Sequence, residues 1–395
     1  LVVNGGTITS KGTGATGDWG DGTGKQDAAA INVNAKYDKT SVEIKGGKIT
    51  AENDAIVLTN GRDGTIAVSG GTFSSDVSAY CEKNYYTEQN EDNTYTVKSM
   101  KDVAVAKIGD TYYKTLPEAV AAAQNGETVT LLKDVTEDVT IPADKTMTLD
   151  LNGKKLTNID NNTITVENGA TLTVTGTGTV DNVTHGKAAV YNKGTVTLAG
   201  GTYERSAEAG ADANDDGGNS YYTVLNHGTM TVNAGVVVNN KGKYSSLFEN
   251  GYYNYNNSDG VVNPTLTING GTFDGGLNTI KNDDNAALTI NGGTFQNYTQ
   301  AAFQNHHIAT VEGGTFIGRG SAKAVLQCGV CSTADEDHDK HQLTISGGYF
   351  FGEITKNVGT ISITGGTFSS DPDAYVAAGH YVDASNNGDY PYTVK

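Results

Sequence analysis

The residues best suited to chemistry are two cysteines and two histidines within one hydrophilic run. They are spaced as Cys328-x-x-Cys331 followed by His338-x-x-His341. Two thiolates and two imidazoles make a complete tetrahedral zinc set, and a bound metal would order a loop that has little apolar content. Two alternatives are a disulfide between the cysteines, which an extracellular location favours, and two free thiols beside solvated histidines. With zinc or with a disulfide, the loop is structural rather than catalytic.

A short acidic insertion predicts a second metal site. It places oxygen ligands at alternate positions, Asp212, Asn214 and Asp216, before a glycine, as in the first half of a calcium loop. The twelfth position of such a loop carries a bidentate Glu, whereas this chain has Thr223 there. The motif therefore predicts weak calcium binding, and a solvated acidic insertion is the alternative. The sequence requires no cofactor, and zinc and calcium are its two candidate structural metals.

Aromatic side chains in two loops are candidate sugar contacts. Tyr252, Tyr253 and Tyr255 stand among asparagines, and Trp19, the only tryptophan, lies in a glycine-rich loop. Aromatic faces stack on sugar rings while amides bond hydroxyls, so these residues predict glycan binding. The alternative is that the same rings pack on the flank of the fold.

A repeated unit must position these residues. The segment from Leu266 to Phe273 is Leu-Thr-Ile-Asn-Gly-Gly-Thr-Phe, in which alternate apolar residues predict a half-buried strand and the glycine pair permits a sharp turn. Repetition of this unit predicts an all-β solenoid. Copies of its Gly-Gly core begin at Gly5, Gly46, Gly70, Gly200, Gly270, Gly292, Gly313, Gly347 and Gly365.

The repeat stops twice in the same way. After Phe73 and again after Phe368 the chain continues with Ser-Ser-Asp, then Ala-Tyr, and finally Tyr-Thr-Val-Lys. A segment found only where repeats stop is best interpreted as a terminal cap. This predicts two modules, residues 1–99 and residues 100–395, and the second cap spans residues 369–395.

One helix is expected, at the start of the second module. Thr115 and Glu118 form a capping box, and Gly126 ends the helix, which predicts a capping helix over residues 115–125. The first eight residues already match a repeat. We therefore expect this chain to be a piece of a longer protein with further domains.

With these motifs, the sequence resembles the Gly-Gly-Thr-Phe-repeat surface proteins of anaerobic Gram-positive gut bacteria. The resemblance covers nearly the whole chain and includes Tyr-Lys-Thr-Leu-Pro-Glu-Ala-Val at 113–120 and Asp-Leu-Asn-Gly-Lys at 150–154. It implies right-handed parallel β-helices of the pectate-lyase-like type on secreted or wall-attached proteins. The implied location is therefore extracellular, and most members of the family have no assigned activity.

Charge and hydropathy exclude several classes of partner. The chain has 27 Lys and Arg against 45 Asp and Glu, a net charge of −18. Nucleic acids and anionic membrane surfaces attract clustered cations instead. No apolar run approaches the length of a membrane span, so no membrane insertion is expected in this segment. The partners that remain are glycans, host surface proteins and other domains of the same chain.

We expect a non-catalytic piece of a bacterial cell-surface protein, a stiff stalk or display surface that engages glycans or a host surface. This expectation rests on the regular repeat, in which no group of reactive residues is brought together in one site. The alternative is a polysaccharide lyase or glycoside hydrolase, which demands two carboxylates, or a carboxylate and a base, in one groove. Asp283 and Asp284 are adjacent, but the three arginines stand far apart in the sequence, so we expect no enzyme.

Overall fold

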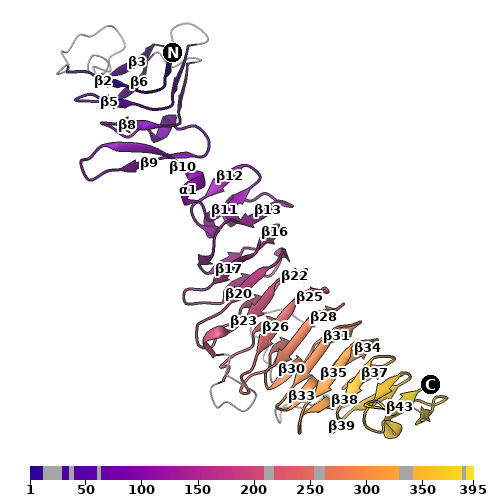
Figure 1. Cartoon of the computed structure of the whole chain (residues 1–395). Coiled ribbons are helices and arrows are strands. Elements are labelled where there is room, and N and C mark those ends of the chain that lie inside the picture. The colour runs from indigo at the N-terminus through magenta and orange to yellow at the C-terminus, as the bar shows by residue number, and fades with distance from the viewer. Residues whose placement is uncertain are drawn as a thin grey trace. The chain divides into compact units, whose positions relative to one another are not determined.

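The computed structural model describes residues 1–11, 29–34, 40–59, 64–208, 218–252, 263–328, 341–384 and 388–395 (Figure 1). It divides into two compact units. The first comprises Leu1–Ala104 and Asp110–Lys114, and the second comprises Val105–Gly109 and Thr115–Lys395.

The first unit consists of short parallel strands whose successive members belong to different sheets. One sheet has the order β1-β4-β7, another begins β2-β5-β8, and β3 pairs with β6. Their bounds are β1 Val2–Val3, β2 Thr7–Thr9, β3 Ile31–Asn34, β4 Ser41–Ile44, β5 Lys48–Thr50, β6 Ile56–Thr59, β7 Thr65–Val68 and β8 Gly71–Phe73. Ile44, Ile49, Val68 and Phe73 are fully buried between these sheets.

An antiparallel hairpin closes one of these sheets. β10 (Tyr95–Ser99) lies antiparallel to β8 and to β9 (Tyr85–Gln89), after a short 3-10 helix, η2 (Ser78–Tyr80). The unit also contains α1 (Met100–Val103) and β12 (Thr111–Tyr113).

The second unit begins with β11 (Ala106–Ile108) and the helix α2 (Leu116–Ala122). The predicted capping box is present, because the Thr115 hydroxyl accepts from the Glu118 amide at 3.3 Å and the Thr115 amide donates to the Glu118 carboxylate at 3.2 Å. The helix is shorter than the predicted 115–125. Its buried face contacts β11, β13 and β15.

Three long sheets follow, and each set of three consecutive strands, here called a rung, adds one parallel strand to each sheet. After β11, the first sheet contains β13 Thr128–Leu131, β16 Thr146–Asp150, β19 Thr171–Thr175, β22 Thr195–Leu198, β25 Thr229–Val232, β28 Thr265–Ile268, β31 Ala287–Ile290, β34 Ile308–Val311, β37 Gln342–Ile345 and β40 Thr360–Ile363.

The second sheet contains β14 Val135–Thr136, β17 Lys154–Thr157, β20 Gly178–Asp181, β23 Thr202–Glu204, β26 Val237–Asn240, β29 Thr272–Gly275, β32 Thr294–Asn297, β35 Thr315–Gly318, β38 Tyr349–Phe351 and β41 Gly366–Phe368. It ends in the antiparallel strands β43 (Tyr392–Val394) and β42 (Val382–Asp383). Two 3-10 helices, η3 (Ser206–Glu208) and η6 (Asp373–Tyr375), follow strands of this sheet.

The third sheet contains β15 Val139–Ile141, β18 Ile164–Val166, β21 Val190–Asn192, β24 Val224–Asn226, β27 Phe248–Asn250, β30 Asn278–Asn282, β33 Ala301–Asn305, β36 Lys323–Gln327 and β39 Ile354–Lys356. The structure is therefore almost entirely β, with long parallel sheets, as the repeats predicted. In the described part of the chain, no helix is long and apolar enough to cross a membrane.

Identical side chains stack between rungs inside the core. The last phenylalanine of the repeat forms a column with ring centroids 4.8–4.9 Å apart. Its members are Phe273, Phe295, Phe316, Phe350 and Phe368. The preceding glycine is required by close packing: Gly271 has a φ of +112°, and a Cβ there would lie 2.9 Å from the Val236 carbonyl oxygen.

A ladder of buried amides runs along the third sheet. Each side-chain amide nitrogen donates to the amide oxygen one rung further on, at 2.7–2.9 Å. The members are Asn192, Asn226, Asn250, Asn282, Asn305 and Gln327. Since each amide bonds its neighbours, the ladder satisfies polar groups that burial would otherwise make costly.

Candidate functional site

The outer face of the third sheet carries polar side chains where three strands lie together. Register pairs Glu249 of β27 with Lys281 of β30, and Lys281 with Gln304 of β33. Their neighbours in each strand, Phe248 and Phe303 among them, point into the core, so these three point outward. All three are nevertheless buried. Outward positions of a sheet are ordinarily solvated, so a row of buried polar side chains is unusual on this face.

A pocket of about 380 Å³ opens on this face. Its lining combines phenol rings, hydroxyls, amides and one lysine, contributed by Tyr222, Tyr244, Ser245, Ser246, Leu277, Asn278, Lys281, Gln300 and Gln304. Lys281 is the one charged residue among them, and its ammonium is paired with Asp283. No carboxylate is among the described residues of the lining.

Asn278 is the centre of the hydrogen bonding in this pocket. Its side-chain nitrogen donates to the amide oxygens of Gln300 at 2.8 Å and Gln304 at 2.7 Å, and to the Ser246 hydroxyl at 3.3 Å. Its Oδ1 is buried and has no partner among the described residues. A buried acceptor without a donor costs about 1–3 kcal/mol, so this oxygen is suited to receive a hydroxyl from a bound molecule.

Two tyrosines supply the aromatic part of the lining. Tyr244 exposes 60% of its surface, and its backbone amide is held by the Asn219 side chain at 3.0 Å. The Tyr222 ring lies 5.2 Å from that of Tyr221. An exposed ring fixed beside amides and hydroxyls offers a stacking surface next to hydrogen-bonding groups.

Two buried carboxyl groups lie beside Lys281 without lining the pocket themselves. Glu249, Lys281 and Asp283 are all buried, and Lys281 contacts the Asp283 carboxylate. Burial raises the pKa of Glu249 well above its usual value; Lys281 lowers this pKa, and the charge and hydrogen bond of Asp283 raise it further. Its burial and the neighbouring Asp283 therefore favour the protonated form of Glu249.

Tyr252 is the one candidate sugar contact that lies within the described residues. Tyr252 is only 1% exposed, and its ring stacks on the His227 imidazole with centroids 4.2 Å apart. Burial raises the pKa of its hydroxyl to about 12. Tyr252 therefore packs against the fold, because its ring lacks the exposed face that a sugar needs. Tyr253, Tyr255 and Trp19 lie outside the described residues.

Half of the predicted zinc set lies within the described residues. Cys328 and His341 are buried, whereas Cys331 and His338 lie outside them, as do the calcium candidates Asp212, Asn214 and Asp216. The described residues contain no cluster of three or more His, Cys, Asp or Glu side chains arranged to hold a metal. The metal predictions therefore stay predictions.

The sequence did not single out His306, which lies beside Cys328. The His306 Nε2 is 3.4 Å from the Cys328 sulfur, and the Gln304 amide donates to that sulfur at 3.2 Å. The signal was the repeat itself, since β33 pairs with β36 in a register that aligns Asn305 with Gln327 and so brings the following residues together.

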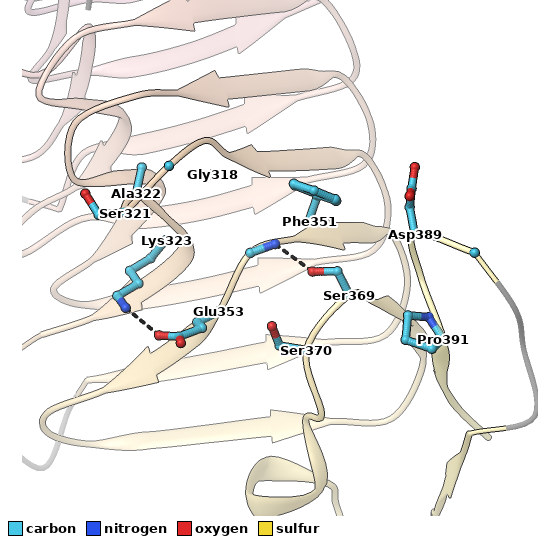
Figure 2. A pocket seen from close by; sticks show the side chains of 13 residues that line it. Gly318, Ser321, Ala322, Lys323, Phe351, Glu353, Ser369, Ser370, Asp389 and Pro391 are labelled. Atoms are coloured by element: carbon cyan, nitrogen blue, oxygen red, sulfur yellow. Dashed lines mark hydrogen bonds and ion pairs between the residues drawn. The ribbon is translucent and has the colours of Figure 1, made fainter. Parts of the chain in front are cut away.

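A second pocket, of about 550 Å³, lies where the last rungs meet the C-terminal hairpin (Figure 2). Figure 2 shows Lys323 paired with Glu353. The Gly352 amide donates to the Ser369 hydroxyl at 2.8 Å. The Phe351 ring borders it. Its charged pair is internally satisfied and partly exposed, and none of the described residues that line it has a buried polar side-chain atom without a partner.

The fold and the pocket define a class of protein, a repetitive parallel β structure with a polar pocket on one sheet. Comparison of the chain with protein-family models, with characterised proteins and with solved structures finds no match.

Proposed function

We propose that this chain is a right-handed parallel β-helix segment of an extracellular, non-catalytic surface protein that binds an uncharged saccharide on its third sheet. The handedness is supported by the rule that crossovers between parallel strands are right-handed. The surface location is supported by the resemblance to Gly-Gly-Thr-Phe-repeat proteins of Gram-positive gut bacteria. A stiff stack of rungs would display the pocket away from the cell.

The observation that carries saccharide binding is the buried, unpartnered Oδ1 of Asn278 in a pocket edged by an exposed tyrosine. A sugar hydroxyl can donate to this oxygen while the sugar ring stacks on Tyr244. The serine hydroxyls and glutamine amides of the lining offer further bonds. Because Lys281 is already paired with Asp283, an uncharged sugar fits the pocket better than an ionic one.

Hydrolysis fits the same pocket less well. A glycosidase needs two carboxyl groups flanking the scissile bond. Glu249 and Asp283 come close to that description, but they are hydrogen-bonded to each other and neither lines the pocket. Lys281 is already paired with Asp283, whereas a lyase reaction needs a base that faces the sugar. Binding is therefore the function that the geometry supports best.

A glycan array probed with the full chain tests the proposal, followed by calorimetry on the glycans that bind. Tyr244→Ala should weaken binding roughly two- to tenfold, the value of one aromatic contact. Tyr381→Ala is the matched control, because Tyr381 is 61% exposed and lies outside the pocket, and it should leave affinity unchanged. New reducing ends or unsaturated products on incubation with polysaccharides would contradict the non-catalytic assignment, and equal loss in both variants would contradict the site.

A further inference from the structure

A lysine of the pocket lining and an aspartate face each other in unusually complete burial. The Lys281 ammonium contacts the Asp283 carboxylate, and their side chains are 6% and 1% exposed. Lys281 belongs to β30, and Asp283 directly follows Asn282, the last residue of that strand. Removing two charges from water is costly, and attraction between them often fails to offset that cost. A reaction that removes both charges would abolish this cost.

Glu249 completes a trio of reactive groups. It stands directly opposite Lys281 on the neighbouring strand β27, and its carboxyl is hydrogen-bonded to that of Asp283. A hydrogen bond between two carboxyl groups requires a proton, and burial, which raises the pKa of Glu249, favours placing that proton on Glu249. Its Oε2 has no hydrogen-bond partner in the described part of the chain. A nucleophile, an electrophile and an acid thus lie together in a buried site.

We propose that Lys281 and Asp283 condense to an intramolecular amide bond, with Glu249 as the catalytic proton carrier. Transfer of one proton from the Lys281 ammonium to the contacting Asp283 carboxylate gives the neutral amine and the neutral acid that the reaction needs. The Nζ lone pair attacks Cγ of Asp283 while Glu249 gives its proton to the carboxyl oxygen and takes one back from nitrogen. A hydroxyl then leaves as water with a proton relayed by Glu249, and the new C–N bond remains.

The reaction balances without a co-reactant. An ammonium and a carboxylate become one amide and one water, with no change of oxidation state. The fold favours the condensation, because two groups held in contact react at effective concentrations far above those reached in solution. The product also removes two buried charges and leaves a neutral amide. This modification is independent of saccharide binding, because the pocket keeps Asn278 and its tyrosines in either state.

Intact mass of the purified, denatured full chain tests the proposal. The expected mass is lower than that of the sequence by one water. Trypsin should fail to cleave after Lys281, and the fragment spectrum should place the loss between residues 281 and 283. A wild-type chain with the full sequence mass and normal cleavage after Lys281 would overturn the proposal. So would a loss that maps elsewhere, for example to a succinimide at Asp274.

Three variants separate the chemistry from mere packing. Lys281→Arg keeps a cation that cannot form the bond, so it should restore the full mass. Lys241→Arg alters a half-buried lysine paired with Asp274 in the same unit, so it should retain the loss of water. Glu249→Gln keeps the shape of the acid without its transferable proton and should also restore the full mass. If Glu249→Gln still shows the bond between 281 and 283, the catalytic role of Glu249 is wrong.

Discussion

Replacing Asn282 by alanine should destabilise the rungs around it by about 2–4 kcal/mol. Asn282 donates to the Asn305 side chain at 2.9 Å and to the Ile308 carbonyl at 3.0 Å, and it accepts from the Asn250 side chain at 2.8 Å. The substitution takes a donor from two buried acceptors, each worth about 1–3 kcal/mol. We expect a loss of stability in the lower half of the summed range, because the Asn305 side-chain oxygen keeps a longer hydrogen bond from the His307 amide at 3.4 Å.

The assay is hydrogen exchange by mass spectrometry on the full chain, read on peptides from β30 to β33, with urea unfolding alongside. Repeat structures open locally and can depart from two-state behaviour, so a local opening free energy is the appropriate quantity. Asn291→Ala is the matched control. Asn291 makes the same type of bond, to the Asn269 side chain at 2.8 Å, but on an exposed face, so its loss should cost no more than about 0.5 kcal/mol. Equal effects of the two substitutions would refute the value assigned to the buried ladder.

Three further predictions concern other parts of the chain. Deleting Asp371 to Lys395 should expose the edge of β41 and cause association, which light scattering after gel filtration would detect; a monomeric, equally stable chain would refute the capping role. Burial alone would raise the pKa of Glu208, but bonds from Ser220, His185 and Arg205 outweigh it and lower this pKa to about 2. The stability that Glu208 contributes is therefore present above its unfolded pKa, near 4.5, and is lost as the pH falls towards 2. Glu208→Gln should lower the melting temperature at pH 7. The melting temperature of this variant should also decrease less than that of the wild type between pH 4.5 and pH 2. If the cysteine and histidine loop binds metal, protein purified without a His tag should contain one zinc ion, and His338→Ala should lose it. No zinc and one reactive thiol would instead support the disulfide.

The rungs could be predicted from sequence because their signals are local. The glycine pair, the alternating apolar residues and the capping box each depend on neighbours within a few positions, and the structure places strands and α2 there. The burial of Tyr252 was not predictable in the same way. Its ring packs on His227, which is 25 residues away in the chain, on the preceding rung.

The pocket and the buried trio lacked a sequence signal for a similar reason. Glu249 is separated from Lys281 by an insertion of irregular length, so no fixed spacing links them. Asp283 was noted only for standing next to Asp284, whereas the structure pairs it with Lys281. Outward positions of a strand are normally solvated, so nothing in the pattern indicated that this row of side chains would be buried.

The two antiparallel hairpins pair in the same register. Phe73 faces Tyr95 in one, and Phe368 faces Tyr392 in the other, with the flanking pairs equally matched. In each case the strand that the hairpin pairs with is the Gly-Gly-Thr-Phe strand that precedes it, and several other rungs supply such a strand. A terminator of this kind can follow any rung that ends in this strand. The number of rungs in such a chain is thus free to change by duplication or loss of whole units, while the ending is kept as an interchangeable part.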